Sequence, residues 1–540
     1  MRRSSQGPGW GVLAAGAVGA IGLVAGESFV ALAVVMMEGM VAWAVLAAAG
    51  LSGGWLIRGV GRGAARWCAR WTLGAGLGIG LLALAVLGLG CGGLLSKPAA
   101  VLLVVVLTAA GTARLVLDVR ARRRGRCVGE EQPQAGAEPV GRWVWLWLLV
   151  VPFMVIALLA ACLPPGVLWA EEGFGYDVLE YHLAAPKYWQ EAGRITFLAE
   201  NVYSNFPLNG AMLSLLLMTL RGEAIEAAYA AQLANVAQGA LFVAAAWLAG
   251  VRFSRRAGMV AGVAAGTAPW LAYLSGIAYV EPGMLAMGTA ALAALLRIRS
   301  GDGRDMSWAI VAGLLAGLAC GYKYTAVALV AVPLAAMILM QRVSVGVRIR
   351  QLAVYGLAAG AAFSPWMIRN AVNTRNPVYP LAWSVFGADE GVWDAELEAR
   401  WQRAHGSATA ERTSSPAAVR VVRRTIGEPR MGVLVLVLAL AGAATARDRM
   451  TLALLAVLVL QAIVWLAATH LYARFAVVLL LPLIVLGARA AMATRRPWPA
   501  LLGAVLVLGA VWNLYHLFEL YYHHTRVGAE HEPVRAYGQT

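Results

Sequence analysis

The sequence predicts an all-α protein that crosses a membrane many times. Of its 540 residues, 60% are hydrophobic and only 13% are charged, whereas a soluble protein of this length is normally about a quarter charged. The mean hydropathy is +0.69. Apolar runs of about 17–25 residues recur along the whole chain, and each is long enough to cross a hydrocarbon core of about 30 Å.

About fifteen such runs make up the predicted helical bundle. The first one, Trp10 to Met37, is too long for a cleaved signal and predicts a retained span. The run Leu208–Leu220 is too short for an easy crossing, and we interpret it as a re-entrant or interfacial helix. The predicted spans are 10–37, 40–57, 72–93, 98–117, 142–163, 226–250, 257–277, 282–298, 308–322, 325–341, 352–368, 431–446, 450–468, 475–490 and 498–518.

Composition divides the chain into four parts. The first four spans are rich in Gly, Ala, Leu and Val, and a polar stretch separates them from the rest. We therefore predict an accessory transmembrane module, a cytoplasmic linker, a catalytic core and an outer tail at 1–120, 121–141, 142–518 and 519–540. The core contains two long hydrophilic segments, 164–225 and 369–430.

Basic residues are concentrated in short loops such as VRARRRGRC, VRFSRR and RIRSGDGR. The positive-inside rule places these loops and the N-terminus in the cytoplasm, and the two hydrophilic segments outside. All seven histidines then lie outside or at the outer end of a span. We therefore expect the charge of +16 to face membrane lipid, with no nucleic-acid partner. The five cysteines have no CxxC spacing, so we expect neither a disulfide framework nor a zinc site.

The first outer segment contains an unusual group of charges, GYDVLEYHLAAPKYWQEAGRI. Asp177 and Glu180 are three residues apart and share a helix face. At the membrane surface one carboxylate can act as general base while the other orients substrate, water or a metal ion. His182 and Lys187 follow on the same segment. The alternative is a solvated helix with ordinary surface charges.

Other outer junctions of the predicted core also carry polar side chains. Lysine and arginine there can neutralise a phosphate or diphosphate, and arginine can bind it bidentately. Taken singly, Lys323 or Arg474 is better explained as an anchor that reaches toward the interface, whereas the cations and acids taken together favour a site. The candidates are Glu281, Lys323, Tyr324, Arg369, Asn370, His470 and Arg474.

Four motifs resemble one known family. YDVLEYHLAAPKYW, GYKYTA, PWMIRNAVNTRNPVYPL and the ARF…P span are similar to the bacterial polyprenyl-phosphate-sugar-dependent glycosyltransferases of the GT-C superfold, relatives of the protein mannosyltransferases and the lipid A aminoarabinose transferases. The resemblance covers about 142–490. It implies a GT-C-like bundle in a bacterial inner membrane, with a periplasmic active site.

The resemblance also implies an inverting transfer of a hexose-type sugar from a polyprenyl-phosphate donor to an envelope glycan, lipid or protein. The acid in the first outer loop acts as base in that family, which corresponds to Asp177, with Glu180 beside it. Lys323, Arg369 and Arg474 are then candidates to stabilise the leaving phosphate, with His182 or His470 as supporting donors.

Other functions stay open at this stage. A transporter or flippase would place ionisable residues near the membrane midplane, in broken helices of repeated halves, whereas the ionisable groups here lie at span ends. An O-antigen-type ligase or polymerase would use outer arginines but explains the acids less well. A noncatalytic scaffold is a third alternative. Asp177, Glu180 and Glu281 can also ligate a hard divalent cation. Helical spacing alone does not show whether the protein uses such a cation as a cofactor.

Overall fold

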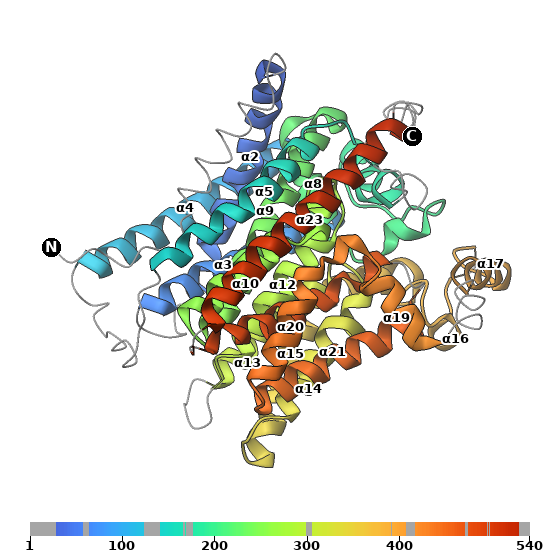
Figure 1. Ribbon diagram of the computed structural model, residues 1–540. Coiled ribbons are helices and arrows are strands. Elements are labelled where there is room, and N and C mark those ends of the chain that lie inside the picture. Colours follow the sequence, from blue (N-terminus) through green and yellow to red (C-terminus); the bar gives the residue numbers. More distant parts are fainter. Residues whose placement is uncertain are drawn as a thin grey trace.

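The computed structural model describes residues 29–57, 64–123, 141–165, 168, 177–298, 305–389, 391–406, 416–469, 473–493, 495 and 497–528. Within these ranges every regular element is a helix. In the same ranges eight helices are long and apolar enough to cross a membrane, or nine if a bent helix pair counts as one span. This confirms the predicted all-α polytopic membrane protein, although several of the fifteen predicted spans form shorter helices (Figure 1).

The long apolar helices frame the bundle. They are α2 (Phe29–Gly53), α3 (Ala64–Cys91), α4 (Lys97–Arg123), η2 with α5 (Gly141–Val150 and Val151–Ala161), α9 (Ala224–Val251), α21 (Arg449–Ala468), η7 with α22 (Ala473–Leu479 and Leu480–Arg489) and α23 (Trp498–Gly528). The other main helices are α8 (Asn209–Arg221), α10 (Arg255–Gly266), α11 (Pro269–Ser275), α12 (Glu281–Leu295), α13 (Asp305–Cys320), η5 with α14 (Val327–Ala331 and Val332–Leu339), α15 (Val345–Thr374) and α20 (Val433–Thr445).

Three predicted segments differ from the structure. The boundary between spans 10–37 and 40–57 is wrong, because α2 runs unbroken through it; residues 10–28 lie outside the described part. The span 257–277 is divided into α10 and α11, which are bent by 56°, and Pro269 begins the second helix, where its missing N–H costs nothing. Finally, α8 is buried on nearly every side, so it is not an interfacial helix.

The predicted accessory module packs directly on the core. Gly39 of α2 lies against Leu233 of α9, and the indole nitrogen of Trp43 donates to the Leu233 carbonyl oxygen at 2.8 Å. Farther along, Gly76 and Gly80 of α3 leave space for leucine side chains of α13. Small residues allow this close approach, as in membrane helix pairs generally. The functional division at residue 120 stays a prediction.

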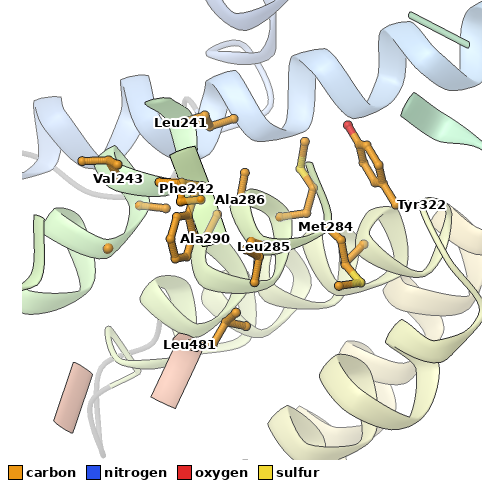
Figure 2. Close-up of a cluster of buried hydrophobic side chains, with 14 of the residues drawn as sticks. Leu241, Phe242, Val243, Met284, Leu285, Ala286, Ala290, Tyr322 and Leu481 are labelled. Atoms are coloured by element: carbon orange, nitrogen blue, oxygen red, sulfur yellow. The ribbon is translucent and has the colours of Figure 1, made fainter. Parts of the chain in front are cut away.

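Close packing also holds the centre of the bundle together. Figure 2 shows Phe242 of α9, Ala290 of α12 and Leu481 of α22 in one buried cluster. Between α13 and α15, Gly317 is so near the Ala359 carbonyl oxygen that an added Cβ would lie 2.2 Å from it. The GLLAG stretch of α13 therefore supplies a smooth helix face for α15.

One end of the bundle carries most of the irregular structure. It gathers the segment after residue 177 with the short helices α16 (Trp383–Phe386), α17 (Ala395–Gly406) and α19 (Ala417–Thr425), on the right in Figure 1. The segment after residue 177 contains η3 (Val178–His182), α7 (Ala184–Ala192) and η4 (Val202–Asn205). The candidate site lies at this end, where irregular backbone interrupts the regular packing of the helices.

Candidate active site

Four of the predicted residues form one buried charged cluster, made of Asp177, Glu281, Lys323 and Arg474. The Arg474 guanidinium donates through Nη2 to Asp177 Oδ2, and its Nε lies 3.6 Å from Glu281 Oε1. Lys323 Nζ donates to the same Glu281 oxygen at 2.9 Å. The Glu281 side chain is 1% exposed and Arg474 4%, against 20% for Asp177. Two cations therefore neutralise two carboxylates in a largely dry site.

Each member of the charged cluster comes from a different helix junction. Asp177 precedes the π-helix η3, and Glu281 is the first residue of α12, with a proline next to it. A carboxylate is favoured at a helix N-terminus by the helix dipole. Lys323 lies in the turn after α13, and Arg474 in the first turn of η7. Junctions position these side chains because charges are costly along the apolar helix faces.

Aromatic rings enclose the cations of the charged cluster. The Arg474 guanidinium lies 4.3 Å from the Tyr279 ring centre, and Lys323 Nζ lies 4.0 Å from that of Phe475. Such contacts stabilise a cation and keep water away from it. Neither ring is among the residues predicted from the sequence, although Tyr279 stands two residues before Glu281 and Phe475 follows Arg474 directly.

The charged cluster sets the protonation of its neighbours. Burial raises the pKa of Asp177, but Arg474 and Lys323 oppose this effect, and the net pKa falls to about 2. Burial lowers the pKa of His182 to about 4, against the attraction of Asp177 and Glu281. At neutral pH Asp177 is therefore ionised and His182 is a neutral imidazole, able to accept a proton.

Arg369 does not join the charged cluster. Its guanidinium donates to the backbone and side-chain oxygens of Asn205 at 3.3 and 3.2 Å, to the Asn370 side chain at 3.1 Å, and to the Thr196 carbonyl oxygen at 3.4 Å. Asn370 in turn donates to the Tyr324 hydroxyl at 2.8 Å. This second group ties the segment after α7 to the end of α15. Arg369, Asn370 and Tyr324 thus support the walls of the site.

The remaining predicted residues are placed elsewhere. Glu180 accepts a hydrogen bond from Asn201 at 3.1 Å. Lys187 lies 5.9 Å from the Tyr188 ring on α7, and no ion pair joins it to the charged cluster in the described part of the chain. His470 lies outside the described residues. Among the residues that the structure describes, no three His, Cys, Asp or Glu side chains lie together as metal ligands.

Helix α17 covers the segment that carries the site. The Trp401 and His405 rings stack at 3.5 Å, and the Tyr203 hydroxyl and His405 Nε2 are hydrogen bonded at 3.0 Å. Tyr203 stacks in turn on Tyr181, next to His182. The two long hydrophilic segments of the sequence are therefore joined by aromatic contacts. These contacts span about 200 residues of sequence, which no local pattern reveals.

Comparisons with known proteins give two solved structures. No protein-family model matches the chain, and no curated protein sequence matches it. The chain is similar to ArnT from Cupriavidus metallidurans in the apo state, with 18% identity and a TM-score of 0.48 over 67% of this chain and 62% of that one. It is also similar to ArnT bound to undecaprenyl phosphate, with 16% identity and a TM-score of 0.49 over 74% and 77%. The chain thus spans about 62% of the first of these structures.

Proposed function

We propose that this protein is a membrane glycosyltransferase that moves a hexose-type sugar from a polyprenyl-phosphate donor to an acceptor of the cell envelope. One observation carries the proposal: the charged cluster combines carboxylates that can take a proton with cations that can hold a phosphate. Asp177 and Glu281 supply the first function, and Lys323 and Arg474 the second. Three of the four lie in motifs that resemble such transferases.

Before the donor binds, the two cations and the two carboxylates of the charged cluster cancel in charge. A donor phosphate disturbs this pairing, and the mechanism follows from that change. A donor phosphate competes with the carboxylates for Lys323 and Arg474, because arginine binds phosphate bidentately and lysine binds it as a point charge. As Arg474 turns to the phosphate, its pair with Asp177 weakens. The pKa of Asp177 then rises toward its ordinary value. Donor binding thus converts a neutralised carboxylate into a stronger base.

The transfer step then follows from these positions. Asp177 takes the proton of the acceptor hydroxyl as that oxygen attacks the anomeric carbon. The bond between this carbon and the phosphate oxygen breaks with inversion, and the lipid phosphate leaves with the bonding electrons. Lys323 and Arg474 stabilise the charge that develops on the leaving oxygen.

The sequence also supports a location for the reaction. The basic short loops favour a cytoplasmic N-terminus, which places the site on the outer face of a bacterial inner membrane. The donor lipid then arrives from the bilayer, and the acceptor arrives from the periplasm. Both routes end at the junctions that hold the charged cluster.

A panel of polyprenyl-phosphate sugars tests the proposal. Purified protein is incubated with each donor, with and without a chelator, and donor consumption is measured by mass spectrometry. We expect turnover of at least one donor, and we expect it to persist in chelator because lysine and arginine compensate the phosphate charge. An O-antigen-type ligase would instead consume only lipid-diphosphate donors.

A transporter is the second candidate. The buried pair of Glu281 and Arg474 and the 56° bend between α10 and α11 are features that transporters use. Substrate-driven flux in proteoliposomes, combined with failure on every sugar donor, would replace the glycosyltransferase proposal with this one.

A further inference from the structure

A small hollow lies beside the charged cluster. It is bounded by α8, α9 and the turn before α12, and it has room for a single water-sized molecule. Tyr279 lines it, and the same ring contacts Arg474. His182 also lines it, with its ring centre 6.2 Å from that of Tyr279. The hollow and the charged cluster are therefore neighbours, and His182 lies at their boundary.

Two amide side chains that line the hollow have a further hydrogen-bonding position for an occupant. The Asn235 amide nitrogen donates its two hydrogens to the carbonyl oxygens of Leu274 and Ile277, both at 2.8 Å, which leaves Oδ1 as acceptor. Gln238 Oε1 accepts from the Tyr322 hydroxyl at 2.6 Å, which leaves the amide nitrogen as donor. The Ser214 hydroxyl lines the same space.

His182 supplies the decisive observation. The residue is 3% exposed, and its Nδ1 is buried without a hydrogen-bond partner among the described residues. A buried polar atom without a partner destabilises the fold, and such atoms are commonly satisfied by ordered water. The described residues that line the hollow include no carboxylate and no lysine or arginine, so a neutral occupant suits it.

We propose that the hollow holds one water molecule, and that His182 passes the proton released by the acceptor hydroxyl through this water, away from the carboxylates. The inference rests on the proposed glycosyltransferase function. His182 receives the proton from Asp177 and does not contact the reacting atoms itself, so it is a positioning residue. The charged and titratable groups that surround it are Asp177, Tyr181, Tyr279, Glu281, Lys323 and Arg474.

The proton steps balance over one turnover. The acceptor hydroxyl gives its proton to the Asp177 carboxylate, and the resulting carboxylic acid gives it to the neutral imidazole of His182. The imidazolium then releases a proton to the water in the hollow, which passes a proton on to the outer solvent, so that both the imidazole and the water are neutral again. Asp177 returns to its ionised form and can pair with Arg474 once more, which resets the charged cluster for the next donor.

Two variants test the relay. His182→Ala should lower kcat by about ten- to a hundredfold while the donor KM stays the same, and added imidazole should restore part of the rate. Ser214→Val adds an apolar group to the lining of the hollow and keeps the His182 imidazole, so it should lower kcat with no rescue by imidazole. His516→Ala, which removes a histidine of α23 that pairs with Glu519 at 3.1 Å, is the matched control and should keep its rate.

The outcomes separate the relay from the proposed function. If the wild type transfers sugar but His182→Ala keeps its kcat, or loses rate that imidazole does not restore, the relay is wrong. If the wild type transfers no sugar, the proposed function fails instead. The water site has its own readout, since an experimental density map should show a peak within hydrogen-bonding distance of His182 Nδ1 and Asn235 Oδ1. An empty or lipid-filled hollow would overturn that site.

Discussion

Arg252 and Arg297 each cap the helix that precedes the other. Arg252 Nε, at the end of α9, donates to the Leu296 carbonyl oxygen at the end of α12, at 2.7 Å. Arg297 Nη2, just after α12, donates to the Leu248 carbonyl oxygen of α9 at 3.1 Å. The last carbonyls of a helix lack partners within it, and a cation there also opposes the helix dipole. The two arginines therefore tie together α12, which begins with Glu281, and α9, which lines the hollow.

Loss of this reciprocal cap should destabilise the bundle. Arg252→Gln and Arg297→Gln should each lower the free energy of unfolding by about 1.5–3 kcal/mol, the usual contribution of a hydrogen bond to a charged group. Thermal unfolding in detergent micelles measures the effect. The double variant should lose more than the sum of the single losses, because each single variant already relieves the repulsion between the two guanidinium groups and the double variant gains that relief only once. Arg255→Gln, an exposed neighbour, is the control, and equal loss there would contradict a specific cap.

Asp177 and Glu180 make a matched pair for testing the base. Asp177→Asn keeps the shape of the side chain but removes the proton acceptor, so transfer should fall by about 10²–10⁴-fold. Glu180→Gln should keep transfer within a few-fold, because Glu180 bonds to Asn201 outside the charged cluster. Radiolabelled sugar transfer by equal amounts of membrane-inserted protein gives the rates. Near-normal transfer by Asp177→Asn would remove Asp177 from the mechanism.

Glu281 should control how tightly the donor phosphate binds. Glu281→Gln removes one negative charge that faces Lys323 and Arg474, so the charged cluster gains a net positive charge. We expect polyprenyl phosphate to bind roughly tenfold more tightly, a change of about 1.4 kcal/mol, and kcat to fall because product release slows. Equilibrium binding in detergent measures the Kd. Weaker binding would show that Glu281 positions the cations instead of competing for them.

The pH dependence of transfer should show no acid limb between about pH 5 and 7. The pKa of Asp177 is about 2, and that of His182 is about 4. Each group is in its deprotonated, proton-accepting form above its own pKa, so activity should fall only as the pH approaches 4 and the imidazole becomes charged. A kcat profile over pH 3–8 checks this. A limb with an apparent pKa near 6.5 that disappears in His182→Ala would show that His182 titrates normally.

The sequence predicts the helical membrane class and which junctions hold charge, because apolar length and the cost of charge in lipid are local properties. It does not predict which cation meets which acid. Arg369 and Arg474 both stand at a span end in the sequence, yet of the two Arg474 reaches Asp177, 297 residues away. Arg369 turns to Asn205, 164 residues away. Partners at such distances are decided by helix packing, which local patterns do not encode.

Close helix packing can be tested on two glycines. Gly317→Ala should lower stability by about 1–3 kcal/mol, because its Cβ would lie 2.2 Å from the Ala359 carbonyl oxygen and push α13 away from α15. A Cβ at Gly360, next to Ala359 on α15, would meet no neighbouring atom of the described chain within 4 Å. Gly360→Ala should therefore be neutral or slightly stabilising through its better helix propensity. Thermal unfolding of both variants in the same detergent makes the comparison.

Since α13 ends just before Lys323, Gly317→Ala should also weaken donor binding while Gly360→Ala leaves it unchanged. Equal behaviour of the two variants would show that the approach of α13 to α15 does not position the lysine.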